Sequence, residues 1–190
     1  MYEAKNFESL LGTEGFSDAL LRNHFTLYEG YVSNTNKVGD ILKNAEVGTP
    51  LYNELKRRYG WEWNGMRLHE LYFTNMIKGG SQLNQSGVLA QKIAKDFGSF
   101  DAWSKDFKAT GAIRGIGWAI LAYDKTGDKL VNSWVNEHDV GHLAGAVPLL
   151  IMDVFEHAFM LDYGIKRADY ITAFWSAIDW SVVEGRFTGK

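Results

Sequence analysis

The stretch that decides the fold is Val147-Pro148-Leu149-Leu150-Ile151-Met152-Asp153-Val154-Phe155-Glu156-His157-Ala158. Its first six residues form a short apolar run typical of a buried strand, and Pro148 lies near the start, where a missing amide donor does least harm. Asp153 ends the run, and His157 follows four residues later. Such a carboxylate and imidazole can converge on one cation, although a buried histidine bonded to a carboxylate is also often structural. The stretch alone leaves both interpretations open.

A metal site here needs further ligands, and the sequence limits where they come from. The chain contains no cysteine, which excludes disulfides, cysteine-ligated iron–sulfur clusters and thiolate zinc sites. Oxygen and nitrogen donors remain. The candidate imidazoles besides His157 are His24, His69, His138 and His142.

Composition restricts the class of protein. The 190 residues are 46% apolar and 14% aromatic, which is enough for a packed core in one or two domains. The net charge is −3, and no basic block or acidic tail indicates binding to nucleic acid or to a membrane surface. No apolar run approaches the roughly 20 residues of a membrane span. We therefore expect a cytoplasmic protein without nucleic-acid or membrane partners.

The N-terminal part predicts two long helices. Ser17 is a suitable N-cap for the first, and Gly48-Thr49-Pro50 interrupts the helical pattern. The second is predicted from Leu51 to about Ile77. Gly60 and Gly65 predict a local break within it, because a glycine in a helix interior costs about 1 kcal/mol relative to alanine.

Lys78-Gly79-Gly80-Ser81 is the best candidate linker, so we predict two domains, residues 1–80 and 81–190. The second domain begins with two predicted helices separated by Gly98 and Ser99. A polar turn between two apolar segments then predicts a β-hairpin. The predicted helices are 88–97, 100–112 and 170–183, and the predicted strands are 117–123, 130–135 and 147–152.

Five motifs, in this order along the chain, resemble those of the iron/manganese superoxide dismutases. They are His69 with Tyr72-Phe73-Thr74-Asn75, Phe97-Gly98-Ser99-Phe100, Gly115-Ile116-Gly117-Trp118, Pro148-Leu149-Leu150 through Asp153-Val154-Phe155-Glu156-His157-Ala158, and Phe174-Trp175 with Asp179-Trp180. The resemblance covers nearly the whole chain. It implies an α+β fold, in which an N-terminal helical hairpin joins a C-terminal domain of helices around a small three-stranded antiparallel sheet.

The resemblance also implies a metal site with one iron or manganese ion per chain, bound by His69, Asp153, His157 and a histidine of the first helix. In the family that histidine lies eight residues before an active-site tyrosine, which Tyr31 matches here, but His24 lies seven residues before Tyr31. The spacing from Phe16 to His24 is that of the family, so we interpret the difference as a one-residue deletion. Residues i and i+7 share one face of an α-helix, and we expect both side chains to face the metal.

Tyr31 and His138 are the remaining candidate catalytic residues. The family often has a glutamine that donates a hydrogen bond to metal-bound solvent; Gly65 excludes it at one of its two usual positions, and His138 lies ten residues before Pro148, as a histidine does in some members. His138 is therefore expected to donate to bound solvent. The alternative for His138 and His142 is a separate zinc site with i,i+4 spacing, which Gly141 disfavours; His142 is expected to be a loop histidine.

Two departures from the family pattern affect the surroundings of the metal. Phe155 stands where a tryptophan is usual, so a ring is kept but an N–H donor is lost. Met160 stands where an interface tyrosine is usual, and that tyrosine's histidine partner is replaced by Tyr28 or Leu27. The ligand residues are unchanged.

The activity implied by the resemblance is conversion of superoxide to O2 and H2O2 by redox cycling of iron or manganese. A homodimer or a tetramer is also implied, with Glu156 accepting a hydrogen bond from a metal-binding histidine of the other subunit. The alternatives are a structural member of the fold that has lost the metal, and a metalloprotein with another redox activity such as a peroxidase.

Overall fold

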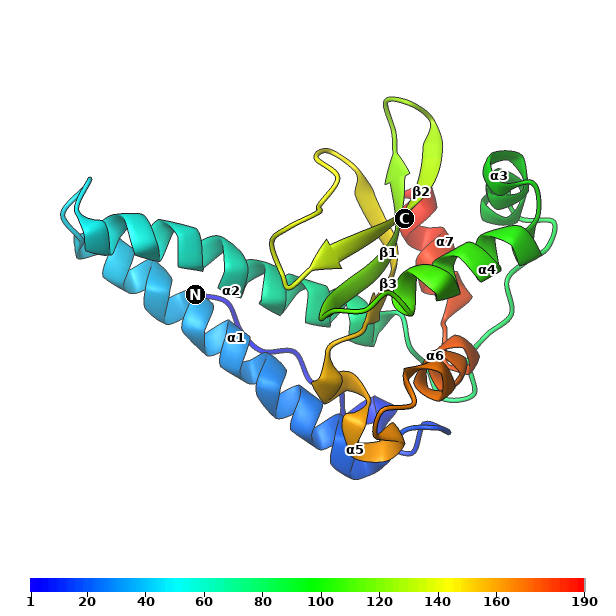
Figure 1. Ribbon diagram of the computed structural model, residues 1–190, viewed down its shortest axis with the longest axis horizontal. Coiled ribbons are helices and arrows are strands. Elements are labelled where there is room, and N and C mark those ends of the chain that lie inside the picture. Colours follow the sequence, from blue (N-terminus) through cyan, green and yellow to red (C-terminus); the bar gives the residue numbers. More distant parts are fainter. Residues whose placement is uncertain (190) are drawn as a thin grey trace.

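The structure, a computed structural model, describes residues 1–189. Two long antiparallel helices, α1 (Asp18–Asn44) and α2 (Pro50–Thr74), form a hairpin that projects from one side of the molecule (Figure 1). Each helix begins at a capped residue: the Ser17 hydroxyl accepts the Leu20 N–H at 3.0 Å, and the Thr49 hydroxyl accepts the Tyr52 N–H at 3.3 Å. α2 runs without a break, so the break predicted at its glycines was wrong.

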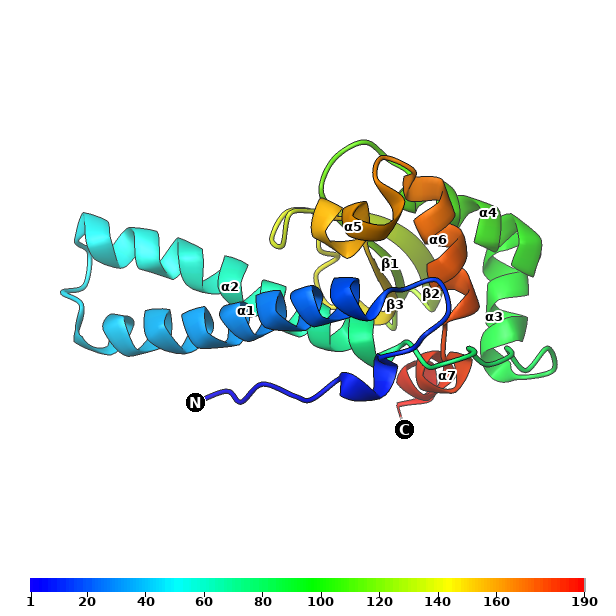
Figure 2. The same ribbon diagram turned by 90° about the horizontal axis from the view of Figure 1, so that it is seen from below.

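The N-terminal segment lies along this hairpin (Figure 2). Tyr2 and Asn36 exchange two hydrogen bonds of 2.8 Å, and the Lys5 N–H donates to the hydroxyl of Tyr28 at 3.0 Å. A short 3-10 helix, η1 (Glu8–Leu10), then leads into α1. The segment is thereby held against α1.

The sheet has the strands β1 (Gly117–Asp124), β2 (Lys129–Asn136) and β3 (Val147–Asp153) in the antiparallel order β2-β1-β3. Trp118 on β1 pairs with Asp153 at the end of β3, and Gly117 pairs with Asn136 at the end of β2. Trp118, Asp153 and the segment that follows β2 therefore meet at one end of the sheet, where β1 begins and β2 and β3 finish. The candidate metal centre lies at this end.

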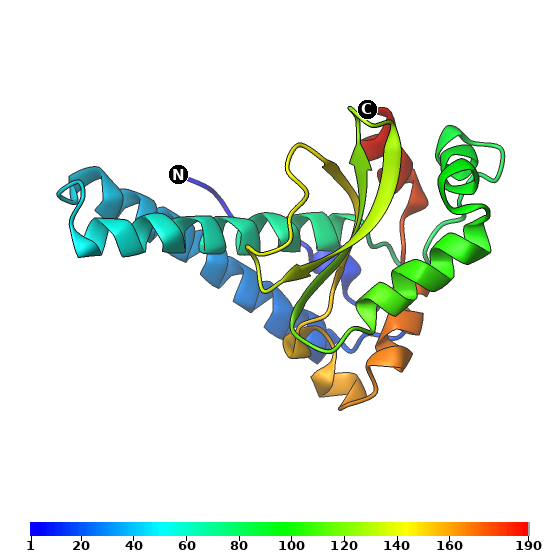
Figure 3. The ribbon, with the colours of Figure 1, turned by 45° about the horizontal axis from the view of Figure 1, so that its top comes forward.

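Helices cover the sheet on both sides (Figure 3). α4 (Phe100–Gly111) packs against β1 and β2, and α3 (Val88–Phe97) packs against β2. On β3, the packing helices are α2 and α7 (Trp180–Thr188). Gly98, between α3 and α4, has a φ of 87°, a left-handed conformation that favours glycine. The predicted helices 88–97 and 100–112 and the three predicted strands agree with this arrangement.

The C-terminal region differs from its prediction. After β3 come the 3-10 helix η2 (Glu156–Ala158), the short helix α5 (Met160–Tyr163), and the helices α6 (Arg167–Ser176) and α7. A single helix over 170–183 was predicted, but Ile178 pairs with Met76 in an isolated β-bridge and the Asp179 carboxylate accepts the Ser181 N–H at 3.0 Å. These two interactions end α6 and begin α7.

Asn75 and Arg186 connect the helical hairpin to the sheet. The buried Asn75 side chain accepts the Ile151 N–H at 2.9 Å and donates to the Tyr72 carbonyl at 2.8 Å. The Arg186 guanidinium donates to the carbonyls of Leu149 and Leu71 at 2.7 and 2.9 Å. The end of α2 is thus fixed against β3, so residues on both elements hold constant positions relative to one another.

The predicted fold class, a helical hairpin with helices around a three-stranded antiparallel sheet, is confirmed. The core between the elements is rich in aromatic rings; its largest fully buried side chains include Trp103, Trp118, Tyr28, Tyr72 and Tyr170. Within residues 1–189, every helix is too short or too polar to cross a membrane.

Candidate metal centre

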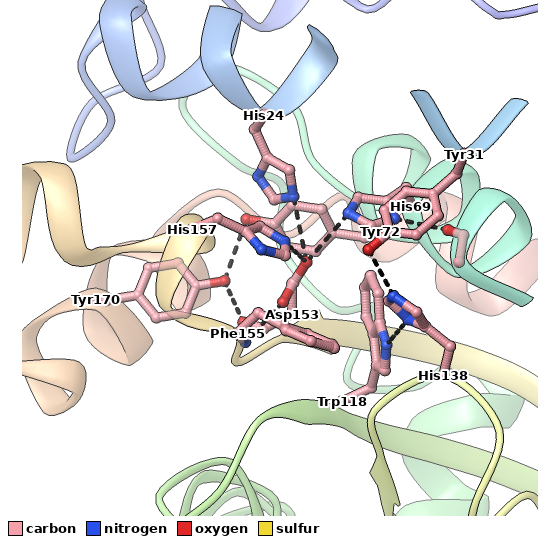
Figure 4. A network of polar contacts seen from close by, with 11 residues as sticks. His24, Tyr31, His69, Tyr72, Trp118, His138, Asp153, Phe155, His157 and Tyr170 are labelled. Carbon is pink, nitrogen blue, oxygen red and sulfur yellow. Dashed lines mark hydrogen bonds and ion pairs between the residues drawn. The ribbon is translucent and has the colours of Figure 1, made fainter. Parts of the chain in front are cut away.

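Four side chains from distant parts of the chain meet at the end of the sheet where β3 finishes (Figure 4). His24 comes from α1, His69 from α2, Asp153 from the end of β3 and His157 from η2. One potential ligand atom from each lies within 4.8 Å of all the others. The structure therefore brings together the four residues predicted as ligands.

The three imidazoles surround one carboxylate oxygen. The Nε2 atoms of His24 and His157 lie 3.2 Å from Asp153 Oδ2, and that of His69 lies 3.5 Å from the same atom. Asp153 and His69 are fully buried, whereas 28% of the His157 side chain is exposed. His157 is therefore the least buried of the four side chains.

Hydrogen bonds around Asp153 fix its orientation. The Phe155 N–H donates to Oδ1 at 2.8 Å, which leaves Oδ2 directed at the imidazoles. The Tyr170 hydroxyl donates to the Asp153 carbonyl at 2.6 Å and accepts from the Tyr72 hydroxyl at 3.1 Å. Sequence reasoning assigned no role to this tyrosine pair; the spacing of Tyr72 three residues after His69, on the same helix face, is the signal that would have indicated it.

The protonation states suit a bound cation. Burial lowers the pKa of His24 and, further, that of His69, so both imidazoles are neutral near pH 7. Burial alone would raise the pKa of the Asp153 carboxyl, but the imidazoles of His157 and His24 hold it well below its usual value. The neutral imidazoles of His24 and His69 beside an ionised carboxylate are donors that a metal cation completes.

His69 provides the most specific test of fit to a metal. Its Nδ1–H donates to the Gly65 carbonyl at 2.6 Å, so the neutral ring carries a lone pair on Nε2. That atom is buried and has no hydrogen-bond partner within residues 1–189. A buried acceptor without a partner costs about 1–3 kcal/mol, and here it faces another lone-pair atom, Asp153 Oδ2. A cation between them satisfies both.

The spacing of seven residues between His24 and Tyr31 falls on a regular helix, because α1 is α-helical throughout Asp18–Asn44. The His24 ring lies 5.0 Å from the His69 ring, and the Tyr31 ring stacks on His69 at 5.1 Å. Both side chains therefore face the centre, as the one-residue deletion predicted. Tyr31 is not among the four converging residues.

Gly65 on α2 makes room for Tyr31. A Cβ atom at this position would lie 2.6 Å from Tyr31 Cδ1, closer than any real contact. The sequence indicated only that Gly65 cannot supply a glutamine side chain. The structure adds that any side chain here would displace the Tyr31 ring.

Both ring nitrogens of His138 are engaged (Figure 4). The Trp118 indole N–H donates to Nδ1 at 3.1 Å, so the single hydrogen of the neutral ring is on Nε2, which donates to the Tyr31 hydroxyl at 2.8 Å. Burial lowers the pKa of His138 to about 4, which keeps the ring neutral near pH 7. Among residues 1–189 the partner of this N–H is the Tyr31 hydroxyl, and donation from His138 to bound solvent stays a prediction. The Tyr31 hydrogen remains available to the centre.

The separate zinc site considered for His138 and His142 does not form. The loop after β2 is not helical, and the His142 Nε2–H donates to the His138 carbonyl at 2.9 Å. With both His138 nitrogens engaged as well, the two rings offer no shared site. His142 is an exposed loop residue, as expected.

The two departures from the family pattern lie in different surroundings. The Phe155 ring stacks on His138 at 4.8 Å and on His157 at 5.0 Å, so it fills the space beside the ligands without donating a hydrogen bond. Met160 is 46% exposed, while Tyr28 is fully buried and its hydroxyl donates to Glu70 at 3.0 Å. Tyr28 therefore belongs to the interior of the hairpin rather than to an outer surface.

Comparisons with known proteins agree with this geometry. Residues 85–186 match the family model described as iron/manganese superoxide dismutases, C-terminal domain. The chain is 38% identical over 183 residues to a protein of Aquifex aeolicus named superoxide dismutase [Fe], covering 92% of this chain and 85% of that protein. It is 37% identical over 167 residues to superoxide dismutase [Mn] 2 of Haloferax volcanii, covering 87% and 83%. The chain belongs to the iron/manganese superoxide dismutase family.

Proposed function

We propose that this protein is a superoxide dismutase, which converts superoxide to O2 and H2O2 at one iron or manganese ion per chain. The observation that carries the proposal is the buried Nε2 of His69, which has no hydrogen-bond partner within residues 1–189 and lies beside Asp153 Oδ2 at a site with two further imidazoles. We propose His24, His69, Asp153 and His157 as the ligands. Nitrogen and carboxylate donors suit iron and manganese, and metal availability decides between them.

When bound, the metal supplies reversible one-electron transfer to and from superoxide. The protein's own residues hold and shield it: Asp153 offsets part of the cation's charge, and the neutral imidazoles donate lone pairs without adding charge. The Tyr31 hydroxyl, which accepts from His138, is oriented to donate its own hydrogen toward the centre.

Purified protein tests the proposal through metal analysis and a superoxide assay on the same samples. We expect about one iron or manganese ion per chain, dismutase activity that scales with metal content, and loss of activity with a chelator. Bound metal without dismutase activity, but with peroxidase activity, would favour another redox function. A chain that binds no metal would favour the structural alternative.

His138→Ala should retain the metal but reduce turnover by about ten- to a hundredfold, because Tyr31 loses the donor that orients its hydroxyl and the Trp118 N–H loses its acceptor. Steady-state kinetics and metal analysis measure both effects. His138→Gln is the matched control, since an amide can accept from Trp118 and donate to Tyr31. Equal turnover in the two variants would contradict this role.

We also propose a homodimer in which Glu156 accepts a hydrogen bond from His157 of the other subunit. Glu156 is exposed, and within residues 1–189 neither its carboxylate nor His157 Nδ1 makes a hydrogen bond. A two-fold axis would pair these groups reciprocally. Beside Glu156 lies a hollow of about 620 Å³, lined in part by Ile116, Phe159 and Ile165, and 92% of Ile165 is exposed.

Glu156→Ala should weaken the dimer and the metal site together. Each subunit would lose an acceptor for a buried imidazole N–H, at a cost of about 1–3 kcal/mol per site. Analytical ultracentrifugation at several concentrations and metal analysis measure the two effects, and also distinguish a dimer from a tetramer. A variant that sediments as the wild-type assembly with full metal content would exclude the cross-subunit bond.

Two further expectations stay predictions. The cytoplasmic location can be tested by cell fractionation. The division at residue 80 into two domains can be tested by expressing residues 1–80 and 81–190 separately.

A further inference from the structure

Trp61 is a residue next to the candidate metal centre to which the proposed function assigns no role. It lies on α2, one helical turn before Gly65. Its ring meets the His138 ring edge-on, with centroids 4.6 Å apart, and lies 5.6 Å from the Tyr31 ring. Trp61 therefore contacts both members of the pair formed by His138 and Tyr31.

The indole N–H of Trp61 bonds to the residue that precedes His138. It donates to Glu137 Oε2 at 3.0 Å, across 76 residues of sequence. Glu137 has a φ of 49°, a left-handed conformation that is uncommon for residues other than glycine. Such a conformation persists where surrounding contacts hold it. The Glu137 N–H, which donates to the Ile116 carbonyl at 3.0 Å, and the bond from Trp61 are two such contacts.

Arg58 holds the Trp61 ring from another side. Its guanidinium lies over the indole, 4.1 Å from the ring centroid, and its Nε–H donates to Glu62 at 2.8 Å. Glu62 is buried, so the arginine is anchored on the same helix one turn away. Contact with a cation and a bond to Glu137 together restrict how the indole can rotate.

We propose that Trp61 is a positioning residue: its bond to Glu137 and its contact with the His138 ring set the direction of the His138 N–H, and thereby the direction of the Tyr31 hydroxyl. The Trp118 bond fixes which nitrogen of His138 carries the hydrogen, and the Phe155 ring stacks on His138. The edge contact of Trp61 and its bond to Glu137 further limit how the His138 ring can tilt, and so set the direction of its bond to Tyr31. The inference deepens the proposed function and rests on it for its kinetic consequences.

Four single variants of the chain, and the double variant of Trp61→Phe with Glu137→Ala, test this role. Trp61→Phe keeps a ring but removes the N–H, and Glu137→Ala removes the acceptor. Glu137→Gln keeps an acceptor oxygen and serves as the conservative rescue. Trp63→Phe is the matched control, because the Trp63 indole on the same helix donates to the Tyr2 hydroxyl at 3.1 Å, away from the centre.

We expect Trp61→Phe and Glu137→Ala each to lower kcat by about three- to tenfold, with little change in KM and with full metal content. This loss of kcat is smaller than the loss expected when a direct hydrogen-bonding partner of the centre is removed. The double variant should lose no more than either single variant, since both remove the same bond. Glu137→Gln and Trp63→Phe should match the wild type. The dissociation constant for azide, measured by visible absorption, should change in Trp61→Phe and Glu137→Ala.

A readout independent of dismutase activity separates this inference from the proposed function. In chains loaded with zinc and labelled with 15N-histidine, the wild-type His138 ring should carry its hydrogen on Nε2, and Trp61→Phe and Glu137→Ala should shift the Nε2 resonance. An inactive wild type would overturn the proposed function without affecting this shift. His138 signals and kcat unchanged in Trp61→Phe, or additive losses in the double variant, would overturn the positioning role.

Discussion

Asp153→Ala should abolish metal binding and dismutase activity together. The carboxylate is the anionic member of the four converging groups, and all three imidazole Nε2 atoms lie within 3.5 Å of its Oδ2. Without it, a buried cation would have three neutral ligands, and its own positive charge would be uncompensated. Because loss of mere hydrogen-bonding partners of ligands costs about 10–100-fold, loss of the ligand should exceed that range.

Asp153→Asn removes the negative charge of this side chain and keeps its shape. The amide oxygen can still accept the Phe155 N–H, which the carboxylate accepts at 2.8 Å, so the end of β3 should keep its conformation. We expect this variant to fold like the wild type yet to bind metal poorly. Metal analysis, superoxide assay and thermal unfolding on all three proteins measure the difference. Full metal content in Asp153→Ala would show that the site is held without the carboxylate.

The fold was predictable from sequence where local patterns agreed with tertiary contacts. Ser17, Thr49 and Ser99 cap helices that begin where expected, since an N-cap hydroxyl acts on neighbouring backbone groups. The end of α6 was not predictable, because Ile178 pairs with Met76, about a hundred residues earlier in the chain. Gly60 and Gly65 were misleading for a related reason: packing against α1 outweighs their low helix propensity.

The candidate site followed the same rule. The ligand residues were implied by the resemblance to the iron/manganese superoxide dismutases, and His24 by its family spacing from Phe16. A spacing of seven residues on a regular helix is compatible with that choice. The role of His138 depended on a partner that sequence could not reveal, since the Trp118 N–H determines which nitrogen carries the hydrogen. Trp61 was also missed, because its bond to Glu137 joins α2 to an irregular loop. Such pairings between distant elements leave no periodic signal.

Gly65→Ala should lower activity by about 10–100-fold through displacement of Tyr31. The added Cβ would lie 2.6 and 2.8 Å from two carbons of the Tyr31 ring, so the ring must move. The 2.8 Å bond from His138 to the Tyr31 hydroxyl would then lengthen or break. Superoxide assays at equal metal content measure this effect, because the three atoms nearest to the added Cβ all belong to Tyr31.

Stability separates this displacement from a general effect of alanine in the helix. Alanine gains about 1 kcal/mol over glycine in a helix interior, whereas overpacking costs about 1–3 kcal/mol, so Gly65→Ala should be neutral or destabilised by up to about 2 kcal/mol. Gly60→Ala is the matched control on the same helix, since a Cβ there meets no atom within 4 Å. It should raise stability and leave activity unchanged. If Gly65→Ala instead behaves like Gly60→Ala in both thermal unfolding and turnover, Tyr31 has room to adjust, and the close approach of α1 to α2 does not fix its hydroxyl.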